Sequence, residues 1–156
     1  MKFSKKINVI SKNQAAFWLD RNGRWHNEHG PFEHKKIRGY FDKSIGRDKD
    51  GYYLFQKTEY GAEKVYFPYE DCALFAVDIK LDNPIRIILN TGRQMKLMPH
   101  HLYIRKNNLY MKIGEDRIKF IAHGLMKIAD MICFKNDQYH IKIDGRKYNI
   151  PKESST

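Results

Sequence analysis

Residues 18–25 read Trp-Leu-Asp-Arg-Asn-Gly-Arg-Trp, and residues 103–110 read Tyr-Ile-Arg-Lys-Asn-Asn-Leu-Tyr. In each stretch an aromatic and an aliphatic residue precede a basic turn that contains asparagine, and an aromatic residue follows it. Behind each stretch comes a segment with helical spacing of apolar residues, and then tyrosine-rich strands that end at Pro68 or Pro151. This repeated order decides our prediction of the fold, because it indicates one α+β unit built twice.

Two segments carry apolar residues at the spacing of an amphipathic helix. Residues 34–45 place Ile37, Tyr40, Phe41 and Ile45 at this spacing, and Gly46 can end the helix. Residues 117–132 give the more regular pattern, with an apolar face made by Ile118, Ile121, Ala122, Leu125, Ala129 and Ile132. Gly124 lies inside this second helix at a cost of about 1 kcal/mol relative to alanine. We therefore expect a close contact between helix and sheet at Gly124.

Turn-forming dipeptides divide much of the remaining chain into β-hairpins. Asn22-Gly23 and Asp144-Gly145 are strong hairpin signals, because both central residues of a type I′ turn need positive φ. We expect hairpins over residues 16–25, 52–67, 102–113 and 139–150 and further strands over 74–81 and 84–89, with residues 94–101 forming a strand or a linker. Isolated hairpins and helices are marginal in water, so each helix should cover a sheet.

The predicted fold class is therefore α+β, with antiparallel strands and one helix packed on the sheet in each of two related units. We place the N-terminal unit at residues 14–98 and the C-terminal unit at residues 99–151. Residues 1–13 are basic and residues 152–156 are polar, and we expect both ends to be flexible.

The chain is basic, with 29 Lys and Arg residues against 18 Asp and Glu residues and a formal net charge of +11. Such an excess attracts nucleic acid or acidic partners, and it also simply keeps a small protein soluble. No stretch approaches the roughly 18 continuous apolar residues of a membrane span, and no signal-peptide pattern is visible. We expect a cytoplasmic protein in which Cys72 and Cys133, which lack a CxxC partner, are buried reduced thiols.

The sequence predicts no catalytic residue, no cofactor and no metal site. Neither cysteine has a neighbouring histidine in the sequence to act as its base, and no glycine-rich phosphate loop is present. The histidines at positions 26, 29 and 34 lack the spacing of a known metal-ligand motif. Glu70, Asp71, Asp78 and Asp82 concentrate carboxylates, which fits a strand-end acidic patch better than acid–base catalysis. An enzyme that uses these carboxylates or His26 and His29 is kept as an alternative.

Basic and aromatic residues around the two turns are candidates for binding nucleic acid, because aromatic side chains beside cations hold single strands. These candidates are Arg21, Arg24, Trp25 and Lys106. Aromatic residues beside a hairpin turn also pin strands to a core, which is the better interpretation of the tryptophans and tyrosines. The arginines are more open to a role at the surface.

Several short motifs follow one another in a fixed order along this chain. They are an aliphatic-Asp-Gly-Trp hairpin, a Pro-led helix start, a helix with a central Phe, an acidic-Gly-Tyr-x-Leu strand, a Val…Glu-Asp strand pair and an aromatic-aliphatic-Arg stretch followed by Leu. Here these are Leu19, Asp20, Gly23, Trp25, Pro31, Phe32, Phe41, Asp50, Gly51, Tyr52, Tyr53, Leu54, Glu59, Val65, Glu70, Asp71, Tyr103, Ile104, Arg105 and Leu109. Together they resemble the bacterial family known as domain of unknown function family 1285, whose Pro-Phe after Glu-Asp is Ala73-Leu74 here. The resemblance implies an α+β fold with repeated motifs and a role in ligand binding or signal transduction, and it defines no catalytic residue.

We therefore expect a non-enzymatic module that binds a small ligand or a protein partner, with a regulatory role. We look for the ligand near the segment that joins the two predicted units, where the candidates are Arg93, Lys96, His100, His101 and Arg105. Nucleic-acid binding is the alternative, and it predicts an affinity that falls steeply with salt.

Overall fold

Two compact units make up the chain, and the structure, a computed structural model, describes residues 6–153. The N-terminal unit ends at Ala73 and the C-terminal unit begins at Leu74. The boundary expected from the sequence, after residue 98, lies inside the second of these units. Each unit is described by itself below.

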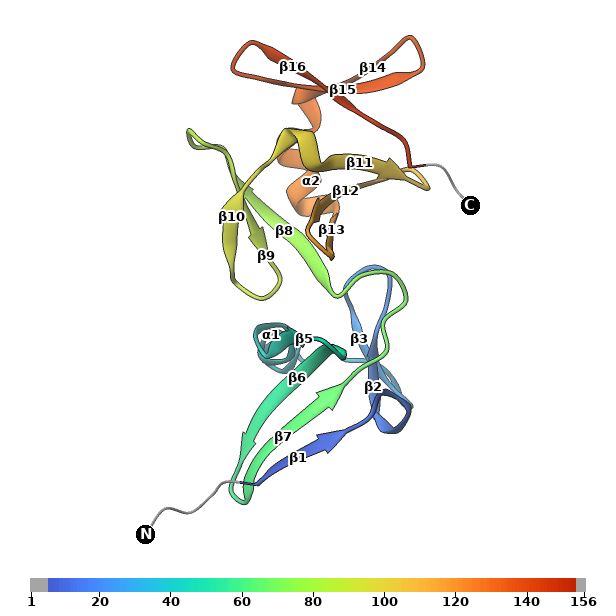
Figure 1. Cartoon of the computed structure of the whole chain (residues 1–156), viewed down its shortest axis with the longest axis vertical. Helices are drawn as coiled ribbons and strands as arrows, with labels where there is room; N and C mark the ends of the chain where they lie inside the picture. Colours follow the sequence, from blue (N-terminus) through green and yellow to red (C-terminus); the bar gives the residue numbers. More distant parts are fainter. Residues whose placement is uncertain (1–5, 154–156) are drawn as a thin grey trace. The chain divides into compact units, whose positions relative to one another are not determined.

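The N-terminal unit contains one mixed sheet, one antiparallel sheet and one helix (Figure 1). A four-stranded sheet has the order β1-β7-β6-β5, and a three-stranded sheet has the order β2-β3-β4. The elements are β1 (Ile7–Ile10), a 3-10 turn (Lys12–Gln14), β2 (Phe17–Leu19), β3 (Trp25–Asn27), β4 (Gly30–Pro31), α1 (Lys35–Lys43), β5 (Ile45–Asp48), β6 (Gly51–Thr58) and β7 (Gly61–Tyr66).

Aromatic side chains form the core of the N-terminal unit. Trp25 and Phe67 are fully buried, and their ring centroids lie 4.9 Å apart in an edge-to-face contact. Phe41 of α1 packs edge-to-face on Trp25 at 5.3 Å and on Phe17 at 5.1 Å. Such edge-to-face pairs add to the free energy gained by burying the rings. The helix is therefore attached to the sheets chiefly through one aromatic residue, and none of its residues is fully buried.

The hairpins expected in this unit are present. Leu54 of β6 lies opposite Val65 of β7 across the turn at Gly61, and Leu19 of β2 lies opposite Trp25 of β3. The turn between β2 and β3 is longer than the two-residue turn expected from Asn22-Gly23, and Gly23 alone among its residues has positive φ. The predicted helix over residues 34–45 is confirmed with slightly tighter bounds.

The expectation of a flexible N-terminal arm is wrong for the described residues 6–13. Ile7–Ile10 forms strand β1, which pairs in parallel with β7 from Ala62 to Val65. Residues 1–5 lie outside the described part of the chain. Because the partner strand is more than fifty residues away in the chain, the sequence near β1 gives no sign of the pairing.

The C-terminal unit is built on a six-stranded sheet with the order β10-β9-β8-β13-β12-β11, followed by a three-stranded sheet with the order β14-β15-β16 (Figure 1). The elements of the large sheet are β8 (Leu74–Lys80), β9 (Arg86–Leu89), β10 (Gln94–Lys96), β11 (Leu102–Arg105), β12 (Asn108–Ile113) and β13 (Asp116–Phe120). The others are a 3-10 turn (Pro99–His101), α2 (Ala122–Ile128), a second 3-10 turn (Ala129–Met131), β14 (Ile132–Lys135), β15 (Gln138–Ile143) and β16 (Arg146–Ile150).

The predicted helix over residues 117–132 is wrong at its start. Residues 116–120 form strand β13, which pairs with β12 on one side and with β8 on the other. The helix α2 begins at Ala122, and a 3-10 turn follows it from Ala129. Ile118 and Phe120 are buried on one face of β13, so an alternating pattern and two neighbouring strands outweigh the helical spacing of Ile118 and Ile121.

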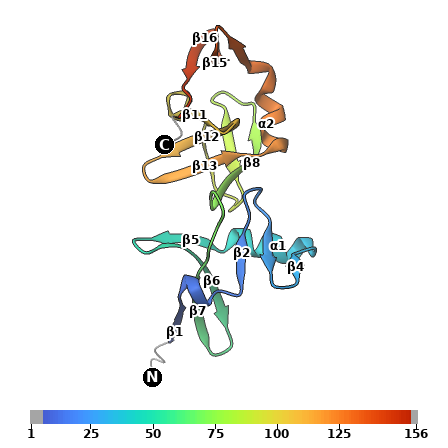
Figure 2. The ribbon, with the colours of Figure 1, turned by 90° about the vertical axis from the view of Figure 1, so that its right-hand side faces the viewer.

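The close contact expected at Gly124 is confirmed. A Cβ atom at this position would lie 3.1 Å from the carbonyl oxygen of Ala76 and 3.4 Å from the amide nitrogen of Asp78. Both atoms belong to β8, at the irregularity in its pairing between Ala76 and Asp78. Figure 2 shows α2 beside β8. Glycine therefore lets α2 lie directly on the backbone of the strand.

The C-terminal hairpins agree with the sequence prediction. Asp144 and Gly145 both have positive φ, as a type I′ turn requires, and β15 pairs with β16 around them. Residues 152 and 153, expected to be flexible, instead continue the structure: Lys152 bridges to Ile104, and the Glu153 amide donates to the Ile104 carbonyl. Residues 154–156 lie outside the described part. An α+β fold is confirmed for the chain.

Candidate functional site

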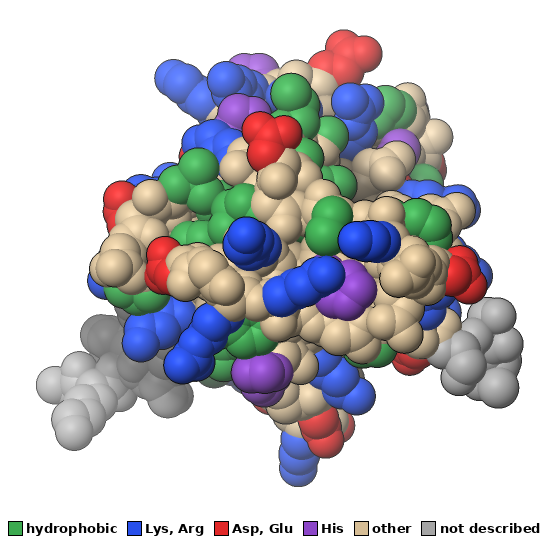
Figure 3. Space-filling view, turned by 90° about the horizontal axis from the view of Figure 1, so that it is seen from above, with side chains coloured by type: hydrophobic (Ala, Val, Ile, Leu, Met, Phe, Trp, Pro, Cys, Tyr) green, Lys and Arg blue, Asp and Glu red, His purple; other side chains and the backbone are tan. Residues whose placement is uncertain are grey.

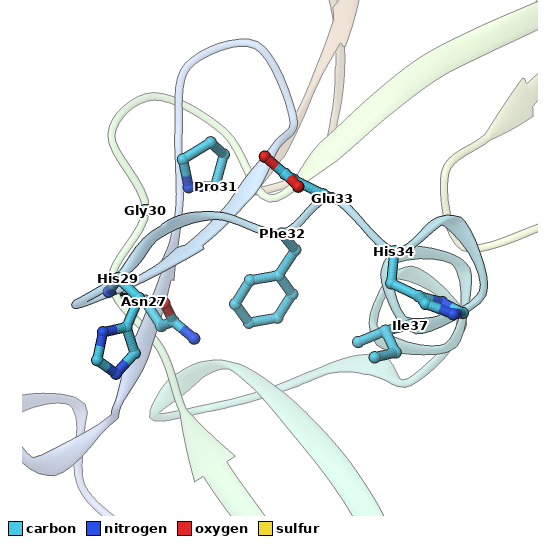
Figure 4. A pocket seen from close by; sticks show the side chains of 8 residues that line it. All are labelled: Asn27, His29, Gly30, Pro31, Phe32, Glu33, His34 and Ile37. Atoms are coloured by element: carbon cyan, nitrogen blue, oxygen red, sulfur yellow. Dashed lines mark hydrogen bonds between the residues drawn. The ribbon is translucent and has the colours of Figure 1, made fainter.

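A pocket of about 480 Å³ opens on the N-terminal unit beside the start of α1. The turn between β3 and β4 and the first turn of α1 supply its walls, and Phe32 lies at its centre (Figure 4). The lining residues are Asn27, His29, Gly30, Pro31, Phe32, Glu33, His34 and Ile37.

Local hydrogen bonds shape the strand-to-helix segment that forms the pocket. The Asn27 side-chain oxygen accepts from the backbone amide of His29 at 2.9 Å, which is the Asx pattern of a tight turn. Gly30 follows at φ +115°, a conformation that only glycine adopts readily. The Phe32 amide then donates to the Trp25 carbonyl at 2.8 Å, which fixes the backbone at the centre of the pocket.

The floor of the pocket is apolar and rests on the aromatic core. The Phe32 ring packs edge-to-face on Phe41 at 5.1 Å, and Phe41 in turn packs on Trp25. The indole nitrogen of Trp25 donates to the Asp42 carboxylate at 2.8 Å, tying the core to α1. Ile37 is 46% exposed although it is a large apolar residue, so its side chain is available to a ligand.

The rim of the pocket is polar. Figure 4 shows the Asn27 amide beside the Phe32 ring, and the Glu33 carboxylate turned away from that ring. His29 and His34 are exposed, and the exposed His29 ring lies 3.3 Å from the Glu28 carboxylate. His34 is the N-cap of α1 but makes no side-chain capping bond, and the first turn of the helix has no acidic residue. The amides at a helix start favour a negative charge, so this side of the rim suits an anionic group.

The first predicted turn keeps its two arginines at the surface but not its tryptophan. Trp25 is fully buried and is a core residue, which corrects its assignment as a candidate for stacking on nucleic acid. Arg21 and Arg24 are exposed, and the Arg21 Nε atom lies 3.4 Å from the Glu70 carboxylate. An arginine beside an acidic partner presents less net positive charge to a phosphate.

Asp20 and His26 hold this turn together. One Asp20 oxygen accepts from the amides of Asn22 and Arg24, and the other lies 2.7 Å from His26 Nε2. Burial of the Asp20 carboxyl acts to raise its pKa, but the hydrogen bonds from Arg24, His26 and Asn22 outweigh burial and leave the pKa below its ordinary value. The Trp18 ring stacks on His26 at 5.4 Å. These contacts give Asp20 and His26 a structural role in holding the turn.

The second predicted turn also mixes core and surface residues. Tyr110 is buried, and Tyr103 stacks on it with centroids 5.3 Å apart. The Arg117 guanidinium lies 5.9 Å from the Tyr103 centroid and 5.7 Å from the Tyr110 centroid. Lys106, the remaining nucleic-acid candidate, is exposed at the tip of the turn with φ +47°. The interpretation of Trp25 and Tyr110 as core residues is confirmed.

The five ligand candidates are spread over several elements of the C-terminal unit. Arg93 is exposed in the turn between β9 and β10, and Lys96 lies on β10 opposite Arg86. His100 packs against Tyr148 at 5.1 Å, while His101 Nδ1 lies 2.8 Å from the Lys112 carbonyl oxygen. Arg105 lies 3.9 Å from the Glu153 carboxylate. Their assignment to a ligand site stays a prediction.

The sequence analysis noted His29 and His34 as part of a histidine cluster, but it predicted no site there and missed the apolar residues that make the pocket. In the sequence, Phe32 stands out only as part of the Pro-led helix start, and Ile37 only as part of the apolar face of a helix. An apolar residue on the outward face of a helix beside a turn that contains Gly30 is the pattern that would have marked the site. Among the described residues, no group of three or more His, Cys, Asp or Glu side chains is arranged to hold a metal ion.

The cysteines differ from each other. Cys72 is buried as expected, but Cys133 is exposed, so its predicted burial is wrong. The apolar run Met131–Phe134 that suggested burial spans the end of a 3-10 turn and most of strand β14, in which no residue is buried and Phe134 is also exposed. No helix in the described part of the chain has both the length and the apolar character needed to cross a bilayer.

The chain is thus an α+β protein of two units with a ligand-sized pocket in the first. No protein-family model matches it, and no curated protein matches it. Its fold is shared with a solved DUF1285 family protein from Silicibacter pomeroyi DSS-3, with a TM-score of 0.60 and 13% identity over 95% of this chain and 84% of that one. A DUF1285 family protein from Shewanella baltica OS155 gives a TM-score of 0.47 and 16% identity over 67% of this chain and 83% of that one. The likeness to the first structure confirms, at the level of the fold, the resemblance inferred from the sequence motifs.

Proposed function

We propose that this chain is a non-enzymatic binding module, a divergent relative of the DUF1285 proteins, and that its N-terminal unit binds a small amphipathic ligand beside α1. The observation that carries the proposal is the pocket with Phe32 at its centre and Ile37 exposed at its edge. An apolar part of the ligand would lie on these two side chains. An anionic group would lie toward the exposed imidazoles and the uncapped start of α1.

The composition of the pocket supports binding over covalent chemistry. Its lining contains no serine, threonine, cysteine or lysine, so the pocket offers no hydroxyl, thiol or amine nucleophile. A few polar groups around an apolar floor are typical of sites that recognise a ligand by shape and orientation. A regulatory role, as the family resemblance implies, would follow if occupancy of this pocket controls a partner.

The test uses anilinonaphthalene sulfonate, a probe that combines aromatic rings with an anionic group. We expect a dissociation constant on the order of 100 µM, because an open pocket buries only part of the probe. Amide chemical shifts should change in residues 27–37 and little elsewhere. Ile37→Ser should weaken binding about fivefold through loss of apolar contact.

Tyr60→Ser is the matched control, because Tyr60 is 92% exposed and lies in the turn between β6 and β7. This variant should bind the probe as the unmodified protein does. Equal affinity of the Ile37→Ser variant, or shifts confined to other residues, would refute the pocket as the ligand site.

Nucleic-acid binding is a weaker second proposal. The net charge of +11 favours it, but the buried Trp25 removes one of its aromatic contacts. On the face shown in Figure 3, Lys and Arg side chains are interspersed with acidic and hydrophobic ones rather than gathered into one patch. A phosphate backbone is best held by a continuous basic stripe.

The duplication of one unit is also kept as a proposal. The echoed segments of the sequence are the hairpins β2–β3 and β11–β12, and a helix follows each of them in the chain. Superposition of the two hairpin-and-helix segments would test it, and a common backbone over both would support descent from one unit.

A further inference from the structure

Three chemically active side chains lie directly opposite one another in the three-stranded sheet at the end of the C-terminal unit. Cys133 of β14 is paired with His140 of β15, and His140 is paired with Asn149 of β16. Residues that are directly opposite in antiparallel strands point to the same face, with Cβ atoms about 4.5–5.5 Å apart. The sheet, drawn in orange to red in Figure 1, therefore aligns a thiol, an imidazole and an amide that are distant in the sequence.

This face of the sheet is the more exposed one, and His140 is half-buried within it. Ile141 and Ile150 are buried on the opposite face, whereas Cys133 and Asn149 are exposed. The same alternation places Lys135, Lys142 and Lys147 on the face of the thiol, and all three are exposed. Strands β14, β15 and β16 contain no Asp or Glu. A small molecule that reaches Cys133 thus meets a basic surface.

One ring nitrogen of His140 is free to accept a hydrogen bond or a proton. Its Nδ1 atom is buried and has no hydrogen-bond partner among the residues that the structure describes. A buried polar atom without a partner is costly, and a thiol opposite it in the sheet is a donor within reach of a side-chain rotation. Asn149, on the other side of His140, can hold the ring by its amide.

We propose that Cys133 is a site of reversible thiol modification, at which small disulfides exchange with a thiol whose proton His140 accepts. The thiolate is the nucleophile in such an exchange, and a neighbouring base raises the fraction of encounters that react. The three lysines favour disulfides that carry negative charge, such as glutathione disulfide. Cys72 is buried and takes no part.

The exchange balances without any further reactant. The Cys133 proton passes to His140 and then to water as Sγ attacks one sulfur of the disulfide. A new S–S bond joins Cys133 to that half, the original S–S bond breaks, and the other half leaves as a thiolate that takes up a proton. The protein thiol is oxidised and one half of the small disulfide is reduced. A reducing thiol reverses the reaction.

The test measures the rate of mixed-disulfide formation on the full chain by mass spectrometry, with peptide mapping to locate the adduct. With neutral hydroxyethyl disulfide at pH 7, Cys133 should react about tenfold faster than the same cysteine in a peptide of residues 129–137. His140→Gln should lower the rate to that of the peptide, and His123→Gln, at an exposed histidine of α2, should not change it. Between pH 6 and 8 the unmodified protein should depend less steeply on pH than the His140→Gln variant. The same groups around the sheet stay unchanged in every variant of this series. They are Asp130, His100 and His101 on the 3-10 turns packed against β15 and β16, Asp137 and Asp144 in the turns between the strands, and Arg105 on β11, which contacts β16.

The lysines are tested with a pair of disulfides. Replacing Lys142 and Lys147 by Gln should slow the reaction with glutathione disulfide about threefold, an effect that salt also produces, and should leave hydroxyethyl disulfide unchanged. Circular dichroism checks that each variant is folded. The proposal is overturned if Cys133 reacts at the rate of the peptide, if His140→Gln leaves the rate unchanged, or if the adduct forms on Cys72 in the folded protein.

Discussion

Asp48 joins two strands of the N-terminal sheet through its side chain. Its carboxylate accepts hydrogen bonds from Lys64 and, at 2.7 Å, from the Tyr66 hydroxyl. The hydrogen bond from Lys64, followed by that from Tyr66, lowers the pKa of Asp48 from 3.8 to about 2. The bond to Asp48 raises the pKa of Lys64, whose ammonium also lies 4.4 Å from the centroid of Tyr53. Asp48 and Lys64 are thus both charged at neutral pH.

The first prediction follows from the lowered pKa of Asp48. A carboxyl whose pKa is lower in the folded state stabilises the protein above its unfolded pKa, and this stability is lost as pH falls through the folded pKa. Asp48→Asn should therefore lower the midpoint of urea unfolding at pH 7. The difference from the unmodified protein should shrink between pH 3.8 and about 2, where Asp48 takes up a proton.

Asp82→Asn is the control for this experiment, because Asp82 is an exposed carboxylate in the loop between β8 and β9. It should change the midpoint little at any pH. A difference between the Asp48→Asn variant and the unmodified protein that stays constant down to pH 2 would contradict the assignment of the stability to the charged form.

At the scale of elements, two helical glycines make opposite predictions. Gly39 lies in α1 with no atom within 4 Å of its ideal Cβ, whereas Gly124 lies in α2 against the backbone of β8. Gly39→Ala should raise the free energy of unfolding by about 0.5–1 kcal/mol, because alanine is the better helix former. Gly124→Ala brings the same gain in helix propensity. However, its methyl group would meet the Ala76 carbonyl oxygen at 3.1 Å.

We expect Gly124→Ala to lower the free energy of unfolding by about 1 kcal/mol, and Gly124→Val to lower it by about 2–3 kcal/mol, because overpacking against backbone outweighs helix propensity. Urea unfolding of the three variants measures these effects. Equal stabilisation by alanine at both glycines would show that α2 moves away from β8 without cost.

The same elements show what the sequence can predict. Turn chemistry placed the hairpins correctly at Asp144-Gly145 and around Gly61, because the requirement for positive φ is local. Apolar spacing failed at residues 116–120, where Ile118 satisfies both a helical and an alternating pattern. The choice there depends on β8 and β12, which pair with β13 from more distant parts of the chain. The prediction for residues 7–10 is wrong for the same reason, because β7, the partner of β1, is remote in the chain.

The candidate sites depend even more on remote contacts. The sequence showed a cluster of histidines at positions 26, 29 and 34 but predicted no site there, and the pocket exists because Phe32 rests on Phe41 and leaves Ile37 exposed. The alignment of Cys133 with His140 arises from strand register, which a search for adjacent residues in the sequence cannot find. In contrast, the burial of Trp25 agrees with the general tendency of aromatic residues beside turns to enter the core.

At the scale of the whole molecule, charge and fold give different information. Each unit has its own buried core, with Trp25 and Phe67 in the first and Phe75 and Met111 in the second. The net charge of +11 belongs to the surface of both. A net charge promotes association with polyanions without specifying a site, so binding to nucleic acid should depend on the number of positive charges and not on their position.

The last prediction tests that statement with two double variants of equal charge. A 20-nucleotide single strand should bind with a dissociation constant of about 10⁻⁵ M or weaker at 150 mM salt, as non-specific complexes do. Arg21→Glu with Arg24→Glu, and Lys49→Glu with Lys57→Glu, each change the net charge by the same amount at exposed positions. We expect both pairs to weaken binding equally in fluorescence anisotropy, because Arg21 is already beside Glu70 and Trp25 is buried. A much larger loss for the arginine pair would instead locate a nucleic-acid site at the turn between β2 and β3, and Trp18, which is partly exposed beside it, would then be the aromatic residue to replace.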